Sequence, residues 1–285
     1  MTQSQLMSQR SEETAVGAAP PARRARRMRP EVVKQRLGTV VLALAILIAA
    51  QIASRNGWVS DLIIPAPTDV YAAFVDQWQT PGFREDVRST VSATVIGFLL
   101  AAAASFLVAA VLVLIKGLEG VVMPLIIAVE TMPKIAIAPI IILWLGFGQL
   151  GKTVIVALVT FFPILINTLQ GLKVTNRDEY DLLRSLGASR MQLFRYVRLP
   201  RSLPYVFAGL RVGSVFALIG AIVAEFVGSR NGLGALIILA RSQFNVPAVW
   251  ALLFNLMVMG VIIYAATSWM ERKLLFWSKD VSLTG

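Results

Sequence analysis

The sequence contains no cysteine and no histidine, and only 15% of its 285 residues are charged. The first two absences exclude disulfides, thiol nucleophiles, Cys/His metal sites and every catalytic triad that needs a histidine. The shortage of charge excludes a soluble domain with a solvated surface, since 56% of the residues are hydrophobic and the mean hydropathy is +0.70. The composition therefore predicts an integral membrane protein, in which most familiar enzyme chemistry is not expected.

Apolar stretches long enough to cross a bilayer recur along the chain. A hydrocarbon core of about 30 Å needs roughly 20 apolar residues of helix. Six stretches qualify and predict an all-α protein with about six transmembrane helices: 38–54, 91–115, 118–147, 153–172, 204–228 and 247–270. The third is interrupted at residues 130–134, so it is either one long broken helix or a helix followed by a short re-entrant piece.

The basic residues indicate how these spans are oriented. With the N-terminus inside, 19 of the 27 Lys and Arg residues fall on the inner side and 6 on the outer side. Because cytoplasmic loops carry an excess of Lys and Arg, both termini and the loop 173–203 are expected in the cytoplasm. The net charge of +11 is thereby assigned to topology, and no nucleic acid is expected as a partner.

The chain is predicted to have three regions. Residues 1–36 are rich in Ser, Ala, Pro and Arg and predict a disordered basic cytoplasmic tail. Residues 37–275 hold the transmembrane domain, and 276–285 form a cytoplasmic C-terminal tail. The Arg-rich run 23–29 either stops translocation or contacts anionic lipid.

Residues 146–153 match the phosphate-loop pattern G-x-x-x-x-G-K-[ST]. A working phosphate loop joins a buried strand to a helix in a soluble domain, whereas this segment joins two predicted spans and faces outside. No soluble stretch is long enough to house a nucleotide domain. We interpret the match as a Gly-rich turn with an interfacial lysine, Lys152, and expect no ATPase activity in this chain.

The segment 175–201 is too polar to span a membrane. Residues 176–179 have capping-box spacing and predict the start of a short helix, which Gly187 ends. Residues 189–192 form a second capping box and predict another short helix, which ends before Pro200. Two amphipathic helices that meet at a glycine would present an apolar face either to a partner protein or to the membrane surface.

This segment resembles the EAA loop of binding-protein-dependent ABC importer permeases, whose pattern is Glu-Ala-Ala, three residues, Gly, and a distal Leu-Pro. Here Asp181-Leu182-Leu183 replaces Glu-Ala-Ala, Gly187 follows, and Leu199-Pro200 ends the pattern. The similarity covers about residues 60–275. Short matches resemble the nitrate/sulfonate/taurine-type branch of the family: 64–68, 161–168, 224–225 and 232–234.

The resemblance implies the type I importer permease fold, with a cytoplasmic coupling helix between helices 4 and 5, in a bacterial inner membrane. It implies a permease homodimer, two cytoplasmic ATPase subunits that hold ATP and Mg²⁺, and an external solute-binding protein, with no cofactor or metal on this chain. The implied substrate is a small organic or inorganic anion such as an alkanesulfonate, taurine or nitrate, or alternatively a thiamine-precursor pyrimidine or another small organic molecule. The residues implied to couple to the ATPase are Asp181, Leu182, Leu183, Leu186, Gly187, Ala188, Ser189, Arg190, Phe194, Leu199 and Pro200.

Four ionisable residues fall inside predicted spans and are candidates for the translocation pathway: Glu130, Lys134, Arg211 and Glu225. A charge at the bilayer centre costs at least about 2.5–3.5 kcal/mol, so each should face a partner, a cavity or an interface. Glu130 and Lys134 are four residues apart and are expected to pair. Arg211 is expected to extend to the interface, and Glu225 either contacts a docked binding protein or gates the pathway.

Irregular backbone is expected in the third span, which contains Pro124, Pro133 and Pro139. Such backbone survives in lipid only where it is buried or lines a cavity, which places the pathway against spans three and five. Gly209 and Gly213 form a G-x-x-x-G pattern that permits close helix packing, for example in a dimer. A self-contained secondary transporter or channel is the alternative function, but it would usually show an inverted repeat, and none is visible.

Overall fold

The computed structural model describes residues 30–115, 117–174 and 177–275, and its elements are all helical. The predicted tails lie outside this part, except for 30–36. The chain divides into two units, residues 1–49 and 50–285. The elements are α2 (Pro30–Arg55), α3 (Pro67–Gln79), α4 (Phe83–Leu114), α5 (Leu118–Thr131), α6 (Lys134–Leu145), α7 (Gln149–Lys173), α8 (Arg177–Ser185), α9 (Arg190–Leu193), η1 (Phe194–Arg198), α10 (Leu199–Phe226), α11 (Leu233–Ser242) and α12 (Val246–Leu274).

The first unit contributes the greater part of α2. Its large apolar side chains from Val41 to Ile48 are more than half exposed, as lipid contact requires. Among the described side chains of α2, the apolar stretch is Val41–Arg55, which has fewer residues than a full span. The predicted span at 38–54 lies within this helix of 26 residues.

The second unit is a bundle of long apolar helices. Four continuous helical segments are long and apolar enough to cross a membrane: α4, α7, Arg190–Phe226 and α12. The pair α5 and α6 adds a fifth if it is counted as one span. The described residues thus provide four or five candidate spans where six were predicted.

The predicted break in the third span is present between α5 and α6, which are bent by 88°. Met132 has extended backbone with ψ of 137°, the conformation favoured before a proline, and Pro133 cannot donate the next helical hydrogen bond. The helices have 14 and 12 residues, so neither is long enough to cross a bilayer alone.

Helix α7 packs between α4 and α10, and small residues permit the close approach. A Cβ atom on Gly209 of α10 would lie 2.8 Å from the Cβ of Asn167 on α7, and one on Gly213 would lie 2.7 Å from Cγ1 of Ile164. The G-x-x-x-G pattern is therefore used inside the chain, against α7. The predicted close helix packing at these glycines is thereby confirmed, and the helix they approach is α7 of the same chain.

We expect Gly209→Val to lower the free energy of unfolding by about 1–3 kcal/mol, because the added carbons must displace α7. Denaturant titration of the purified protein in detergent would measure this loss. Gly120→Val is the matched control, since a Cβ on Gly120 meets no atom within 4 Å. Equal losses in the two variants would contradict the packing argument.

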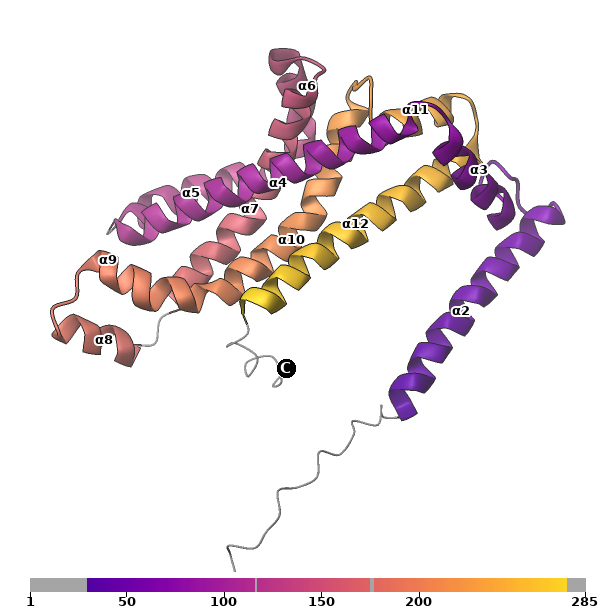
Figure 1. The fold of residues 1–285 in the computed structure, drawn as a ribbon. Coiled ribbons are helices and arrows are strands. Elements are labelled where there is room, and N and C mark those ends of the chain that lie inside the picture. The colour runs from indigo at the N-terminus through magenta and orange to yellow at the C-terminus, as the bar shows by residue number, and fades with distance from the viewer. Residues whose placement is uncertain (1–29, 116, 175–176, 276–285) are drawn as a thin grey trace, which may run out of the picture. The chain divides into compact units, whose positions relative to one another are not determined.

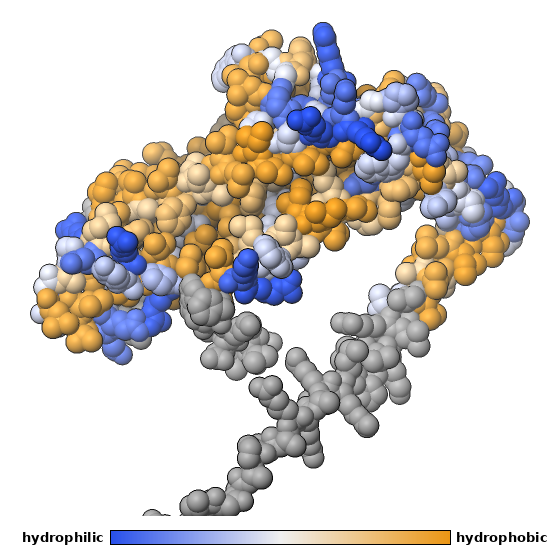
Figure 2. All heavy atoms as spheres, viewed as in Figure 1, coloured by the Kyte–Doolittle hydropathy of each residue, from blue (hydrophilic) through white to orange (hydrophobic). Residues whose placement is uncertain are grey.

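The two ends of this bundle carry different short helices. Figure 1 shows α8 and α9 at one end, where α4 finishes and α10 begins, and α6 and α11 at the opposite end. We call these the loop end and the α11 end. Hydrophobic residues cover the sides of the bundle, and hydrophilic residues are interleaved with them at the loop end (Figure 2).

The helix that starts after Ser189 does not end before Pro200, as the sequence analysis expected. It continues from α9 through the π-helical turn η1 into α10. The N–H of Leu199 donates to the carbonyl of Phe194, five residues back, and Pro200 lies in the first turn of α10, where its missing N–H does no harm. The second loop helix and the fifth predicted span are consequently one continuous element.

Candidate functional site

The loop that links α8 to α9 is built from two end-capping motifs. Gly187 has φ of +80°, and the N–H of Ala188 donates to the carbonyl of Leu183 at 3.0 Å while that of Gly187 donates to Arg184 at 3.0 Å. This is a Schellman ending, and its left-handed residue favours glycine. The backbone direction between the two helices is thereby fixed.

The second predicted capping box is confirmed. The N–H of Ser189 donates to Oε1 of Gln192 at 2.7 Å, and the N–H of Gln192 donates to Oγ of Ser189 at 3.3 Å. The first predicted box cannot be described, because Asn176 lies outside the described residues. Helix α8 begins at Arg177, next to that position.

The loop divides its apolar side chains between the core and the surface. Leu182, Leu186, Met191 and Tyr196 are 61%, 74%, 59% and 67% exposed, and we call these four the apolar loop surface. Phe194 is buried and belongs to a core cluster with side chains of α4 and α7. Of the other predicted coupling residues, Asp181, Gly187, Ser189, Arg190 and Pro200 are exposed, while Leu183, Ala188 and Leu199 are half-buried.

Side chains tie α8 to the start of α10. Both carboxylate oxygens of Glu179 accept hydrogen bonds from the guanidinium of Arg201, one of them from Nε at 2.8 Å. The guanidinium of Arg198 lies 5.4 Å from the ring centroid of Tyr180. Exposed pairs add little stability, but two-point contacts of this kind fix an orientation. Helix α8 is thus oriented by the helix that runs into the bundle.

At the α11 end, a buried ion pair joins α7 to α10. Glu225 is fully buried and Lys152 is 3% exposed, with Nζ of Lys152 3.5 Å from Oε1 of Glu225. The ammonium also donates to Oγ of Ser89 at 2.6 Å and to the carbonyl of Asn231 at 3.0 Å. Both charges are therefore paired and hydrogen-bonded, as burial demands.

The first turn of α11 is hydrogen-bonded to side chains around the same ion pair. The N–H of Gly232 donates to Oδ1 of Asp86 at 2.7 Å, that of Leu233 to Oγ1 of Thr90 at 2.9 Å, and that of Gly234 to Oε2 of Glu225 at 2.8 Å. Thr90 in turn donates to Oε1 of Glu225 at 2.8 Å. Side chains of α4 and α10 thus hold the start of α11 in place.

Lys152 is the residue that sequence reasoning misplaced. It is not an interfacial lysine in a turn, because α7 begins at Gln149 and carries it into the interior of the bundle. The phosphate-loop match is preceded by helix α6, with Gly148 as the N-cap of α7. A pattern in the sequence could have identified Lys152. It is a lone cation at the start of one apolar stretch, and Glu225 is a lone acid within another, so the two could have been expected to pair.

The other charges within predicted spans have different partners from those expected. Nζ of Lys134 lies 3.2 Å from the main-chain carbonyl of Glu130 and 4.6 Å from the Phe162 ring centroid. The expected ion pair between the side chains of Glu130 and Lys134 is not among the ion pairs of the described residues, because the break at Pro133 separates their helices.

Arg211 reaches the last turns of α12. Its Nε lies 3.2 Å from Oε2 of Glu271 on α12. Glu225 is too deeply buried to touch a docked protein in this conformation, which corrects one of its two expected roles.

An apolar bundle of span-length helices with an amphipathic loop at one end is typical of a helical membrane protein. The sequence profile of a family described as binding-protein-dependent transport system inner membrane component matches residues 93–276. The chain belongs to this family, whose members include permeases of ABC transporters.

Similar proteins span nearly the same length. The Formylaminopyrimidine transport permease protein ThiX of Halalkalibacterium halodurans is 35% identical, over 76% of this chain and 86% of that protein. The Riboflavin transport system permease protein RibX of Chloroflexus aurantiacus is 35% identical, over 85% and 90%. The Putative aliphatic sulfonates transport permease protein SsuC of Bacillus subtilis is 29% identical, over 83% and 86%.

A solved structure has a related fold. The match is to a chain of a structure titled "Crystal structure of an amino acid ABC transporter with histidines", with a TM-score of 0.56 and 17% identity. It covers 70% of this chain and 98% of that one. The helical bundle described above is therefore similar in fold to a component of an ABC transporter.

Proposed function

We propose that this chain is the transmembrane permease subunit of an ATP-driven importer, with the ATPase on separate subunits that hold ATP and Mg²⁺. The observation that carries the proposal is the apolar loop surface, which is held by two capped helix ends at one end of a membrane bundle. Large apolar side chains on a polar end of a protein mark an interaction site. In a chain of this family, the cytoplasmic ATPase is the partner that fits.

The coupling route follows from the contacts of the loop. A movement imposed on α8 reaches α10 through Glu179–Arg201 and through Tyr180 against Arg198, and α9 is continuous with α10. Helix α10 packs closely on α7 at Gly209, and Glu225 in its last turn accepts a hydrogen bond from the start of α11. A rigid-body displacement at the loop end would therefore move the elements at the α11 end.

The proposed assembly is a permease homodimer with two ATPase subunits. The basic loop 173–203 and both termini face the cytoplasm, as the distribution of Lys and Arg indicates. The α11 end then faces the external binding protein that delivers the solute.

The substrate is proposed to be a small solute of one of two chemical classes. One is an anion of the alkanesulfonate, taurine or nitrate type, as the name of SsuC suggests. The other is a nitrogen heterocycle, as the names of ThiX and RibX suggest. Lys152 and Arg211 are paired with carboxylates and so are not free to bind an anion. Lys134, in contrast, contacts a main-chain carbonyl and the Phe162 ring and is the cation that an anionic solute would meet.

Affinity purification from the native host tests the proposal. We expect a P-loop ATPase to co-purify with the wild-type chain and to be at least about tenfold depleted in Gly187→Pro, because proline fixes φ near −65° and lacks the N–H that donates to Arg184. Gly187→Ala should give a smaller loss, since alanine tolerates a left-handed conformation at a cost of about 1–2 kcal/mol.

The outcome that would overturn the proposal is a chain that purifies without an ATPase and moves solute across liposomes in the absence of ATP. The chain would then be a self-contained secondary transporter or channel. Uptake by the purified assembly of a labelled alkanesulfonate against a labelled aminopyrimidine would separate the two substrate classes.

A further inference from the structure

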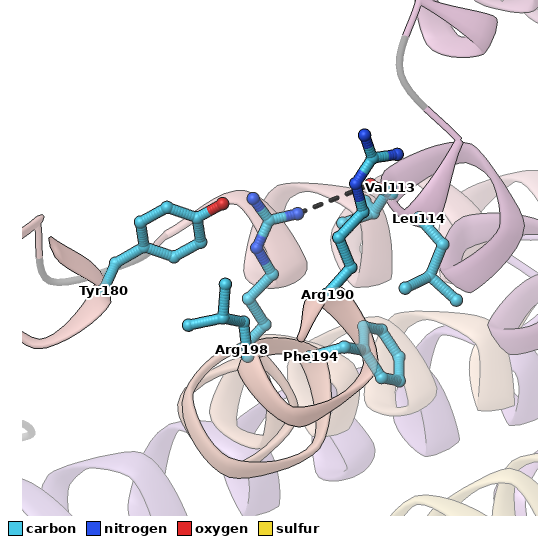
Figure 3. A pocket seen from close by; sticks show the side chains of 7 residues that line it. Val113, Leu114, Tyr180, Arg190, Phe194 and Arg198 are labelled. Atoms are coloured by element: carbon cyan, nitrogen blue, oxygen red, sulfur yellow. Dashed lines mark hydrogen bonds between the residues drawn. The ribbon is translucent and has the colours of Figure 1, made fainter. Parts of the chain in front are cut away.

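Two cavities meet at Arg198, at the loop end of the bundle. One has a volume of about 70 Å³ and is lined by Val113, Leu114, Tyr180, Arg190, Leu193, Phe194 and Arg198. The other has a volume of about 270 Å³ and includes Leu112, Ile115, Glu119 and Lys173, and it shares Val113 and Arg198 with the first. Figure 3 shows the guanidinium of Arg198 between the Tyr180 ring and Val113, with Arg190 beside it.

The hydrogen-bonding capacity of Arg198 is largely unused. Its Nη1 is 3.5 Å from the carbonyl of Val113, at the limit of a hydrogen bond. Its Nε is buried and has no hydrogen-bond partner among the described residues. A guanidinium offers five donors, and leaving a buried one unpaired is costly. The site therefore lacks an acceptor group.

The missing group should carry negative charge. Arg190 lines the same cavity as Arg198, and two guanidinium groups that share a cavity repel each other unless an anion lies between them. Among the residues that line the two cavities, Glu119 is the one carboxylate, and it is already paired with Lys173. Arginine is suited to phosphate, which it binds through two parallel hydrogen bonds.

The residues around Arg198 and Arg190 favour a lipid headgroup over a free anion as the ligand. The first cavity holds one compact group rather than a whole metabolite, and its other walls are apolar. It opens at the end of α4, whose side chains Leu107, Val111 and Ile115 are exposed as on a lipid-facing helix. The inner leaflet of a membrane is anionic and attracts basic segments next to the spans.

We propose that Arg198 and Arg190 bind the phosphate of an anionic lipid headgroup, with the acyl chains lying along α4. This proposal depends on the proposed function in one respect, namely that the loop lies at the cytoplasmic membrane surface. The bound lipid would stabilise the junction between α8 and η1, where Tyr180 contacts Arg198 in the proposed coupling route.

Native mass spectrometry of the purified full-length chain, in detergent with added phosphatidylglycerol or phosphatidylcholine, tests the proposal. We expect about fivefold less retained phosphatidylglycerol in Arg198→Gln and in Arg190→Gln, the factor typical of one basic residue at a membrane surface. Arg195→Gln is the matched control, since Arg195 is exposed on the same turn and lines neither cavity. It should change retention by less than about twofold.

Three results would overturn the assignment: equal retention of the two lipids, an equal loss in Arg195→Gln, or binding of inorganic phosphate that depends on Arg198 while no phosphatidylglycerol is retained. The last result would assign the site to a free anion. If Arg198→Gln does not purify as a single species, Arg190→Gln decides the question, because that side chain is exposed. The chain is produced for this assay without its ATPase, so a failure of lipid binding would leave the proposed coupling function untouched.

Discussion

Removing either member of the Lys152–Glu225 pair is expected to destabilise the protein by about 3–5 kcal/mol. Glu225→Gln would leave a buried ammonium with only Ser89 and Asn231 as partners, and Lys152→Met would leave a buried carboxylate with only Thr90 and Gly234. A charge in a buried site without its counter-charge is the costly state. Denaturant unfolding of each purified variant in detergent would measure the loss.

The double variant separates this explanation from simple loss of packing. In Lys152→Met with Glu225→Gln no buried charge remains, so we expect a much smaller cost than the sum of the single losses. Arg211→Gln serves as a comparison, since it removes a cation from the less buried pair with Glu271. Additive losses in the double variant would show that the two charges do not stabilise each other.

Leu186→Asp is expected to reduce ATPase association at least about a hundredfold while leaving the stability of the chain unchanged. Leu186 is 74% exposed, so its loss removes no core contact, whereas an acid in the centre of an apolar interface must be desolvated without a partner. Co-purification measures the association, and thermal unfolding in detergent measures stability.

Ser185→Asp is the matched control for this variant. It places the same charge one residue earlier, on an exposed side chain that is not part of the apolar loop surface. Association should fall by much less in this control than in Leu186→Asp. If both variants retain the ATPase, the apolar loop surface is not the docking site.

The features that could be predicted from the sequence depend on residues that are close together along the chain. The capping box at Ser189 and the break at Pro133 are local, and each is found where it was expected. The helical class follows from long apolar runs, which only helices can satisfy in lipid. The number of spans was less predictable, because α5 and α6 are each too short to cross a bilayer alone and are bent by 88° at the break between them.

The features that the sequence did not predict depend on which helices become neighbours. Lys152 and Glu225 are far apart in the chain, and only the packing of α7 on α10 brings them together. Arg211 finds Glu271 in the same way, on a helix that the sequence analysis had not paired with it. Pro200 was interpreted as a helix stop, although a proline in the first turn of a helix is equally compatible with a start.

The π-helical turn η1 has a consequence for how loops of this kind can diversify. An α-helix turns by about 100° per residue, so the one extra residue in a π turn changes the direction in which everything before it faces. In this chain α9 and Met191 precede η1, and the whole of α10 follows it. Insertion or deletion of a single residue here would rotate the loop before η1 about the axis of α10, while the side chains of that loop stayed the same.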